Sequence, residues 1–217
     1  GGISALGDKA HRLGHRLQTV KTSDDLYRSL VSEWSLDSGI LEGVSIQPPS
    51  QLDDPLPKFG ADDPAMRMMV QDMRSYLPDD ILCKVDRAAM GISLETRTPF
   101  LDPDVIRLAT RLPMGMKIRE GQGKWALRQL LYQHVPREII DRPKAGFAIP
   151  IGLWLRGPLR EWAEDMLSSQ RLADDGLFNP DIIRQTWLEH LSGRRDWTTR
   201  LWAILMFQPW YAAQARA

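Results

Sequence analysis

The chain has 217 residues, enough for one large domain or two small ones. Lys plus Arg and Asp plus Glu both number 28, so the net charge is zero and lacks the basic excess that indicates a nucleic-acid partner. No apolar run reaches the ~20 residues needed to span a membrane, and Gly1-Gly2-Ile3 does not open a signal peptide. The single cysteine, Cys83, excludes an internal disulfide and a multi-cysteine zinc site and is typical of a reducing, cytoplasmic compartment.

The first part of the chain is predicted to contain two helices and a long connection. Apolar residues at helical spacing predict a helix over residues 3–20 and a second that begins at Ser23. Residues 43–64 hold five of the 15 prolines and several Asp residues, which predicts an irregular connection longer than a compact domain usually has. Two interpretations of this connection stay open: it covers a partner domain, or it is a surface loop.

The rest of the chain is also predicted to be helical, from apolar spacing, prolines at first helical positions and Asp or Asn at N-caps. The predicted helices cover residues 64–77, 78–90, 102–112, 121–136, 158–167, 179–191 and 196–213. The proline- and glycine-rich residues 141–152 are predicted to form a loop. Regular alternation of strands and helices is absent, so residues 1–217 are predicted to form a single, mostly α-helical domain or subdomain.

The stretch from Tyr76 to Asp102 sets eight charged residues among apolar ones. Charges in an apolar setting are costly unless they are paired, metal-bound or used in chemistry, so this stretch is either a structural ion-pair cluster or part of an active site. Glu95 and Arg97 point to the same side if their segment is extended, with a salt bridge that anchors a turn as the structural alternative. Asp102 precedes a proline and is predicted to be a helix N-cap.

Two carboxylates in the same stretch are candidates for binding a metal ion. Asp79 and Asp86 are seven residues apart, about two helical turns, and so share one face of the predicted helix. Two carboxylates on one face can hold Mg²⁺ together with substrate phosphates. Carboxylates on a solvated helix face are the structural alternative.

Three basic residues further along are candidates for binding an anion. Lys124 and Arg128 form an i, i+4 pair on the helix predicted after Gly121–Gly123, where like charges repel unless an anion lies between them. The glycine-rich start of that helix offers free N–H groups for a phosphate. Lys144 lies in the constrained loop RPKAGFAIP, where an ammonium can stabilise a phosphate or an oxyanion. The structural alternatives are a solvated helix face and a solvated loop lysine.

Taken together, these segments resemble the synthetase domain of glutamine-hydrolysing asparagine synthetases. The resemblance covers about Met69 to Leu167 and follows the order of the family's blocks. Three blocks carry it: YLPDDILCKVDRAAM, SLETRTPFLD and GKWALRQLLYQHVPREIIDRPKAGFAIPIGLWLRGPLREW. Their combination is specific, although each block alone is not.

The resemblance implies an ATP-dependent amidation of aspartate. In the family, ATP activates the side-chain carboxylate as β-aspartyl-AMP and releases pyrophosphate, with Mg²⁺ on the phosphates, and ammonia from glutamine then displaces AMP. Glu95 matches a glutamate that takes a proton from the ammonia adduct, and Lys144 matches a lysine that stabilises charge on the phosphates and the oxyanion. Four further residues match positions that shape the substrate and nucleotide site: Arg97, Asp102, Lys124 and Arg128.

The sequence also departs from the family. The SGGxDS pyrophosphate loop and the strand-rich half are absent, and Cys83 lies mid-helix rather than at the N-terminal position of the family's glutaminase nucleophile. Gly1-Gly2 matches a pair that follows the family's nucleotide-binding strands. We therefore expect the helical C-terminal part of an adenine-nucleotide α-hydrolase-like (α/β) synthetase domain. Its partners would be the protein's own missing glutaminase and ATP-binding regions, and this part alone would be inactive and bind no cofactor tightly.

Two functional alternatives stay open at this point. Relatives that amidate sugar-linked or peptide carboxylates, or that close lactam rings, reuse the same domain. A non-catalytic helical interaction module is the other, because the Pro- and Asp-rich connection and the eight tryptophans offer a surface for a partner. The sequence leaves the oligomeric state open, with a homodimer among the options.

Overall fold

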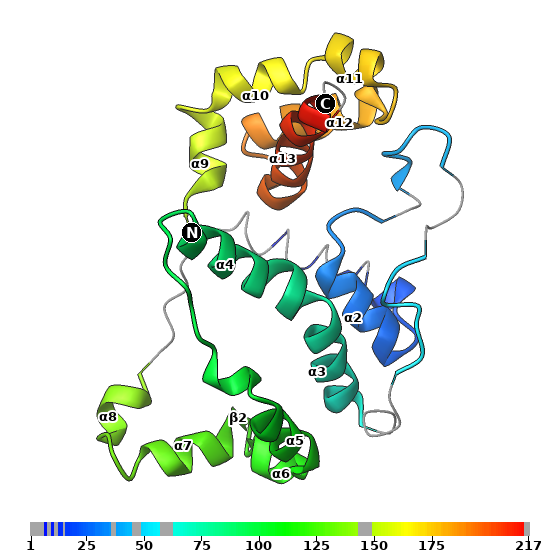
Figure 1. Cartoon of the computed structure of the whole chain (residues 1–217). Coiled ribbons are helices and arrows are strands. Elements are labelled where there is room, and N and C mark those ends of the chain that lie inside the picture. The colour runs from blue at the N-terminus through cyan, green and yellow to red at the C-terminus, as the bar shows by residue number, and fades with distance from the viewer. Residues whose placement is uncertain are drawn as a thin grey trace. The chain divides into compact units, whose positions relative to one another are not determined.

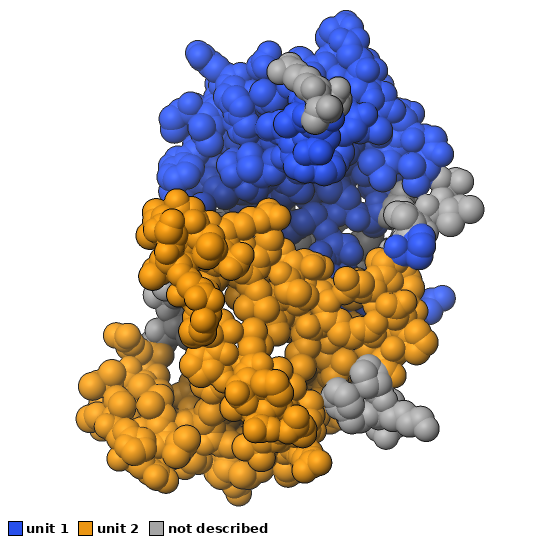
Figure 2. All heavy atoms as spheres, in the orientation of Figure 1, with its two compact units in different colours: residues 1–49, 148–217 blue, residues 50–147 orange. Residues whose placement is uncertain are grey.

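The computed structural model (Figure 1) is mostly α-helical, as the sequence predicts. It describes residues 7, 10, 13–14, 16–35, 38–44, 49–56, 63–142 and 149–214. Within these ranges, no helix is long and apolar enough to cross a membrane. The chain divides into two compact units, coloured separately in Figure 2: unit 1 comprises residues 1–49 and 148–217, and unit 2 comprises residues 50–147.

Two helices of unit 1, α2 (Ser23–Val31) and α12 (Pro180–Leu191), begin at side-chain N-caps. Thr22 and Asp25 form a capping box, in which each side chain accepts a hydrogen bond from the other residue's backbone N–H. Asn179 accepts from the N–H groups of Asp181 and Ile182, as its position before a proline predicts. The helices of unit 1 with defined bounds are α2 (Ser23–Val31), α9 (Ile151–Arg156), α10 (Arg160–Met166), α11 (Ser169–Asp175), α12 (Pro180–Leu191) and α13 (Thr198–Gln214). Of the helix predicted over residues 3–20, the structure describes only part, and residues 16–19 there are helical.

The core of unit 1 forms around α13, which contacts α9, α10 and α12 (Figure 1). Trp187 of α12 is fully buried, and its indole N–H donates to Glu164 of α10. One contiguous cluster contains the buried apolar side chains: Ile40, Leu155, Ala163, Leu167, Leu172, Phe178, Ile183, Trp187, Leu201, Ile204 and Leu205.

The N-terminal residues of unit 1 are tied to its C-terminal helices. An isolated β-bridge pairs Leu41 with Phe178, next to the start of α12. The indole N–H of Trp34 donates to the carbonyl of Arg200 at 3.2 Å. The Arg200 guanidinium lies 5.0 Å from the ring centroid of Trp34 and 4.6 Å from that of Trp197, so it is in cation–π contact with both indoles.

One histidine belongs to the core of unit 1. His190 is fully buried, and its Nδ1 accepts from the Trp197 N–H and faces Nη2 of Arg156, both at 3.2 Å. Its Nε2 lies 3.3 Å from the Gly152 carbonyl and therefore carries the proton. Burial and then the charge of Arg156 lower the pKa of His190, while the nearby carboxylate of Asp196 opposes this shift. The ring is therefore held in its neutral form.

Unit 2 is a succession of short helices and one β-hairpin. Strands β1 (Ile118–Arg119) and β2 (Gln122–Gly123) are antiparallel, with Ile118 opposite Gly123. The remaining elements are α3 (Pro64–Arg74), the π-helix η3 (Leu77–Leu82), α4 (Cys83–Met90), the 3₁₀ turn η4 (Pro99–Leu101), α5 (Pro103–Arg111), α6 (Met114–Lys117), α7 (Trp125–Leu131) and α8 (Arg137–Ile140).

Unit 2 buries very little of its apolar surface. Among its described residues, only Val70 and Gln71 are buried. The sequence of α5 is amphipathic, yet this helix contains no buried residue. The exposed large apolar side chains of the unit are Met73, Tyr76, Val85, Met90, Ile92, Leu94, Phe100, Val105, Leu108, Met116, Ile118, Leu127, Leu130, Leu131 and Ile139.

Among the differences from the predicted elements in unit 2, two bear on the candidate residues. Residues 77–82 are π-helical rather than α-helical, at a junction where Pro78 contributes no N–H to the hydrogen-bond ladder. The helix predicted from Gly121 is instead preceded by the hairpin. Glu120 and Gly121 have φ of 52° and 75°, the two positive values that a type I′ hairpin turn requires.

Residues 143–148 of the loop predicted over residues 141–152 lie outside the described residues, and its last two positions belong to α9, which begins at Ile151. The helix α11 was also not predicted as a separate element. Leu155 of α9 and Leu172 of α11 are both fully buried in the core cluster. Tertiary packing stabilises these two short helices where local sequence signals are weak.

Candidate active site

The segment that carries Glu95 leaves α4 through a Schellman motif. The Leu94 N–H donates to the Ala89 carbonyl at 3.0 Å, and the Ser93 N–H donates to the Met90 carbonyl at 2.9 Å. Ser93 occupies the left-handed position of the motif, with φ of 60°. That position is usually taken by Gly or Asn, because a Cβ is strained there. These hydrogen bonds set the direction of the backbone immediately before Glu95.

The glycine in this turn does not occupy the left-handed position. Gly91 is the C-cap of α4, which ends at Met90 as the predicted helix over residues 78–90 does. Its φ is −57°, however, so the turn does not use the conformational freedom of glycine at this position. The chain reverses direction only at Ser93, two residues after Gly91.

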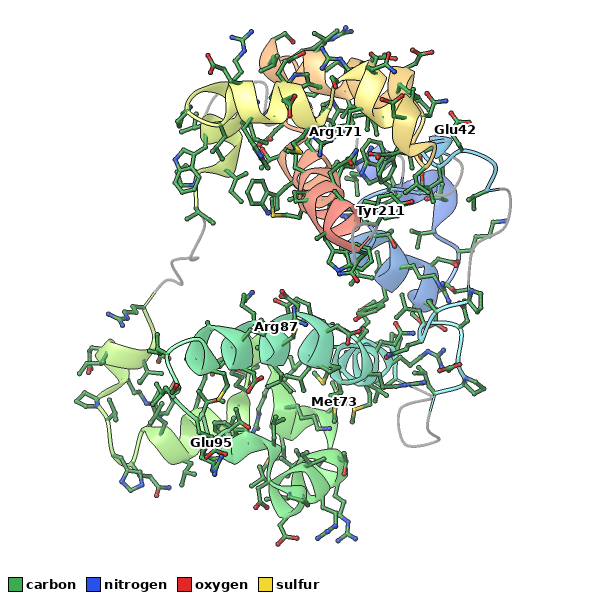
Figure 3. All side chains as sticks on the ribbon, turned by 45° about the horizontal axis from the view of Figure 1, so that its top comes forward. Glu42, Met73, Arg87, Glu95, Arg171 and Tyr211 are labelled. Atoms are coloured by element: carbon green, nitrogen blue, oxygen red, sulfur yellow. The ribbon has the colours of Figure 1, made fainter. Side chains whose placement is uncertain are left out.

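Glu95 and Arg97 form an ion pair between Oε1 and Nη1, which is the structural alternative considered for these residues. Glu95 lies in the irregular segment between α4 and η4 (Figure 3). The two side chains are 70% and 75% exposed, so water screens the pair and it contributes little to stability. The Glu95 carboxylate is therefore accessible as an acceptor of protons or hydrogen bonds.

Asp102 is the N-cap of α5. Its Oδ1 accepts from the Asp104 N–H at 2.8 Å, which matches the local prediction. Asp104 in turn pairs with Arg107 on the exposed side of the same helix. The cap fixes the start of α5 directly after the SLETRTPFLD block, and a role for Asp102 in substrate binding stays a prediction.

The two candidate metal ligands lie on different kinds of helix, Asp79 on η3 and Asp86 on α4. A π-helix has wider turns than an α-helix, so the seven-residue spacing no longer argues for a shared face. Within the described ranges, no group of three or more His, Cys, Asp or Glu side chains is arranged to hold a metal ion. No magnesium ligand in this chain is therefore assigned, and Asp79 and Asp86 stay predictions.

Lys124 and Arg128 are not a pair on one helix. Lys124 is the N-cap of α7 and adopts a left-handed conformation with φ of 60°. The helix begins after it, at Trp125, because the hairpin occupies the residues before it. The spacing argument for an anion held between Lys124 and Arg128 on one helix face therefore does not apply to this geometry.

Arg128 has partners within unit 2. Its Nη1 pairs with Oδ1 of Asp141 at 2.5 Å, and its Nε donates to the Gly123 carbonyl at 3.3 Å. The same Oδ1 accepts from the hydroxyl of Tyr132 at 2.6 Å. The guanidinium of Arg137 lies 4.4 Å from the ring centroid of Tyr132.

Two separate ion pairs involve candidate residues. Glu95 contacts Arg97, and Arg128 contacts Asp141; among the described residues, no hydrogen bond or ion pair joins these two contacts. Lys144 lies outside the described residues, three positions after Asp141.

Sequence reasoning missed Tyr132 and Asp141. The sequence does contain one indication of this contact, since Arg128 and Tyr132 are spaced i, i+4 and so face the same side of a helix. Asp141 is an acidic residue directly before the RPKAGF segment. The sequence does not show how the connection between α7 and α8 turns, and this turn brings Asp141 close to Arg128 and Tyr132.

Comparisons with known proteins agree with the blocks quoted from the sequence. The asparagine synthase family model matches residues 4–212. A provisionally named asparagine synthetase (glutamine-hydrolyzing) from Mycobacterium tuberculosis is 42% identical over 151 residues, or 69% of this chain and 23% of that protein. Asparagine synthetase (glutamine-hydrolyzing) 1 from Bacillus subtilis is 32% identical over 146 residues, or 67% of this chain and 23% of that protein.

A shorter match connects the chain to a different named activity. Carboxyethyl-arginine beta-lactam-synthase from Streptomyces clavuligerus is 39% identical over 51 residues, which is 24% of this chain and 10% of that protein. No solved structure matches the chain significantly. The matched stretch spans about a quarter of the length of the first two relatives, 23% in each case.

Proposed function

Because the chain belongs to the asparagine synthase family, we propose that the protein containing it is an ATP-dependent carbon–nitrogen ligase that converts aspartate to asparagine. The observation that carries this proposal is the family match over residues 4–212. Two relatives named as glutamine-hydrolyzing asparagine synthetases support it. ATP and the aspartate side chain would give β-aspartyl-AMP and pyrophosphate. Ammonia released from glutamine would then attack the activated carbonyl, lose a proton and expel AMP.

Glu95 would act as the general base in the second step. Its ionised carboxylate would accept the proton that the attacking ammonia loses, which prevents the adduct from expelling ammonia again. Arg97, paired with Glu95, would hold the carboxylate in position. Lys144 would stabilise negative charge on the phosphates and on the oxyanion of the tetrahedral adduct. Magnesium would neutralise charge on the ATP phosphates when bound.

The remaining part of the protein would cover unit 2. Amidation of an acyl-adenylate requires exclusion of water, which would otherwise hydrolyse it. The Glu95 side chain is 70% exposed. Large apolar side chains that lie near Glu95 in the sequence of unit 2 are exposed as well. We assign the covering role to an ATP-binding parallel sheet of the adenine-nucleotide α-hydrolase type. A glutaminase region would supply the ammonia, and residues 1–217 alone would be inactive.

Activity measurements on the full-length protein test this proposal. With ATP, Mg²⁺, aspartate and glutamine, it should release AMP and pyrophosphate and form asparagine. Glu95→Gln should lower kcat by about 10²- to 10⁴-fold, the usual contribution of a general base. The matched control Glu138→Gln, on α8 of the same unit, should stay within about twofold of wild type. Equal activity of wild type and Glu95→Gln would contradict the assigned role, and turnover by residues 1–217 alone would contradict the inactivity of this part.

A second acceptor is favoured by one specific observation, the match to a beta-lactam synthase. That enzyme class also activates a carboxylate, but the attacking amine belongs to the same molecule, so a ring closes. If the full-length protein releases no AMP with free aspartate but does so with a carboxylate that carries its own amine, this alternative replaces asparagine synthesis. Formation of asparagine at a rate that matches AMP release excludes it.

A further inference from the structure

His190 of α12 connects three segments of unit 1 through both of its ring nitrogens. Its Nε2–H donates to the Gly152 carbonyl of α9 at 3.3 Å. Its Nδ1 accepts from the N–H of Trp197, directly before α13, at 3.2 Å and lies 3.2 Å from Nη2 of Arg156 of α9. Arg156 also donates through Nε to the His190 carbonyl at 2.7 Å. One guanidinium therefore holds both the backbone and the side chain of the same histidine.

The imidazole of His190 is tightly enclosed. It is fully buried, and it stacks on the indole of Trp187 with ring centroids 6.1 Å apart and an angle of 21° between the planes. A Cβ placed on Gly152 would lie 3.6 Å from Cε1 of the ring, so the ring packs against the backbone of α9. A change in the hydrogen bonding of the ring must therefore be accommodated by the segments around it rather than by rotation of the side chain.

Protonation of the ring is incompatible with its present contacts. A proton on Nδ1 makes that atom a donor, which would then face the N–H of Trp197 and the guanidinium of Arg156. Among the described residues, two charged groups face the ring: Arg156 from α9, and Asp196 from the connection between α12 and α13, whose Oδ1 lies 3.7 Å from Nδ1. The imidazolium would repel the cation and attract the carboxylate. Its contact with α9 would therefore weaken, while a contact with Asp196 would replace the one with Trp197.

We propose that His190 is a pH-sensitive switch, which holds α9 on α12 while its ring is neutral and releases α9 when its ring is protonated. Helix α9 has six residues, too few to be stable alone, so it depends on these contacts and on the burial of Leu155. It is also the first helix after the boundary between the units at residue 148. The switch therefore controls how firmly the chain is held where it re-enters unit 1. Burial and the Arg156 charge lower the pKa of His190, so release requires an acidic solution.

Hydrogen exchange of the α9 amides in the full-length protein tests this switch without any enzymatic activity. Exchange rates corrected for the intrinsic rate at each pH give the equilibrium constant for opening of α9. This constant should not change from pH 8 to about pH 6.5 and should rise below that, because the open form takes up one proton. The rise is at most tenfold per pH unit and should reach about fivefold or more at pH 5. The amides of α11, which carries no partner of the ring, should show no such rise.

Three variants separate His190 from other groups that titrate. His190→Gln keeps a donor and an acceptor but does not titrate, so opening of α9 should become independent of pH. The matched control His134→Gln, at an exposed site in unit 2, should keep the rise of the wild type. Asp196→Asn changes a side chain that is 64% exposed and leaves the core intact. It removes the carboxylate that would receive the imidazolium, so the rise should begin at a lower pH.

The wild type alone is sufficient to overturn the proposal. A constant opening of α9 from pH 8 to pH 5 would show that protonation of His190 does not release this helix. An equal rise in α9 and α11 would show that His190 is protonated only when the whole of unit 1 unfolds. An unchanged rise in His190→Gln would assign the pH dependence to another group, and the switch would be rejected in each of these cases.

Discussion

In unit 1, eleven apolar side chains are buried in one cluster, whereas the described part of unit 2 buries only Val70 and Gln71. Both units are built mainly from helices, and each contains helices that begin at a side-chain N-cap. In unit 1, α9, α10 and α12 each contact α13 and cover one another's apolar sides. In unit 2, amphipathic helices such as α5 leave apolar side chains including Leu108 exposed.

This difference shows that local sequence signals do not by themselves give a helical unit a packed core. The α-helices of unit 2 range from four residues in α6 and α8 to 11 in α3. Isolated helices shorter than about 12 residues are marginal in water, so they need burial of apolar surface to be stable. Unit 1 supplies that burial from its own residues. We propose that unit 2 obtains it from a further part of the full-length protein, where the proposed reaction would also find its nucleotide.

Core truncation gives the largest expected contrast between the units. Leu205→Ala removes a fully buried side chain of unit 1 and should lower the free energy of unfolding by about 2–5 kcal/mol. Leu108→Ala removes a side chain of unit 2 that is 62% exposed, and should cost less than about 0.5 kcal/mol in residues 1–217. Denaturant titration measures both values. An equal loss in the two variants would mean that unit 2 has a core of its own.

Adding a methyl group at a glycine tests the same packing difference by adding atoms rather than removing them. A Cβ at Gly152 would lie 2.4 Å from Oγ1 of Thr198, which is too close, so Gly152→Ala should destabilise unit 1 by about 1–3 kcal/mol. A Cβ at Gly115 in α6 of unit 2 meets no atom within 4 Å. Gly115→Ala should therefore be neutral or stabilise by up to about 1 kcal/mol, because alanine favours the helix. Thermal unfolding checks both, and a tolerated Gly152→Ala would contradict the tight packing of α9 on α13.

The buried histidine predicts a pH dependence that is confined to unit 1. Burial and the Arg156 charge lower the pKa of His190 in the folded state, so the unfolded chain binds this proton first as the pH falls. Stability from this group is complete above about pH 6.5 and declines below it, by at most about 1.4 kcal/mol per pH unit, until the folded-state pKa is reached. His190→Gln should remove this component, measured by unfolding titrations from pH 8 to pH 5. His134→Gln, at an exposed site in unit 2, should leave it in place; an identical slope in His190→Gln and wild type would contradict the prediction.

The smallest expected effect concerns the turn before Glu95. Ser93 has φ of 60°, which glycine adopts without a Cβ penalty, so Ser93→Gly should stabilise the Schellman motif by about 0.5–1 kcal/mol. Hydrogen exchange of the Leu94 amide, which is bonded to Ala89, should slow accordingly. Faster exchange at Leu94 would show that serine contributes an interaction that glycine cannot replace.

The parts of the fold that follow from neighbouring residues were predictable. The caps at Asp102 and Asn179 depend on one side chain and the next two or three N–H groups, and both formed as the sequence indicates. The Glu120-Gly121 turn escaped prediction because Glu at a positive φ is uncommon, and helix α9 escaped because the burial of Leu155 stabilises it.

The candidate site residues could be proposed only from the combination of sequence blocks, and their roles stay predictions. The pairing of Glu95 with Arg97 is local and could be anticipated, since one residue separates them. The contact of Arg128 with Asp141 spans 13 residues and depends on how α7 and α8 are joined, so spacing could not predict it. A role for Arg128 in the nucleotide site stays a prediction. The π-helical turn likewise altered the relation between Asp79 and Asp86, because spacing arguments assume a regular helix.

Hydrogen exchange on residues 1–217 and on the full-length protein tests the central claim, that unit 2 obtains its core from the rest of the protein. The amides of residues 64–142 should exchange at least about tenfold more slowly in the full-length protein, because covering the apolar surface suppresses local opening. The amides of residues 151–214 should exchange at nearly the same rates in both, because unit 1 already contains its own core. Equal protection of residues 64–142 in the two proteins would contradict the account.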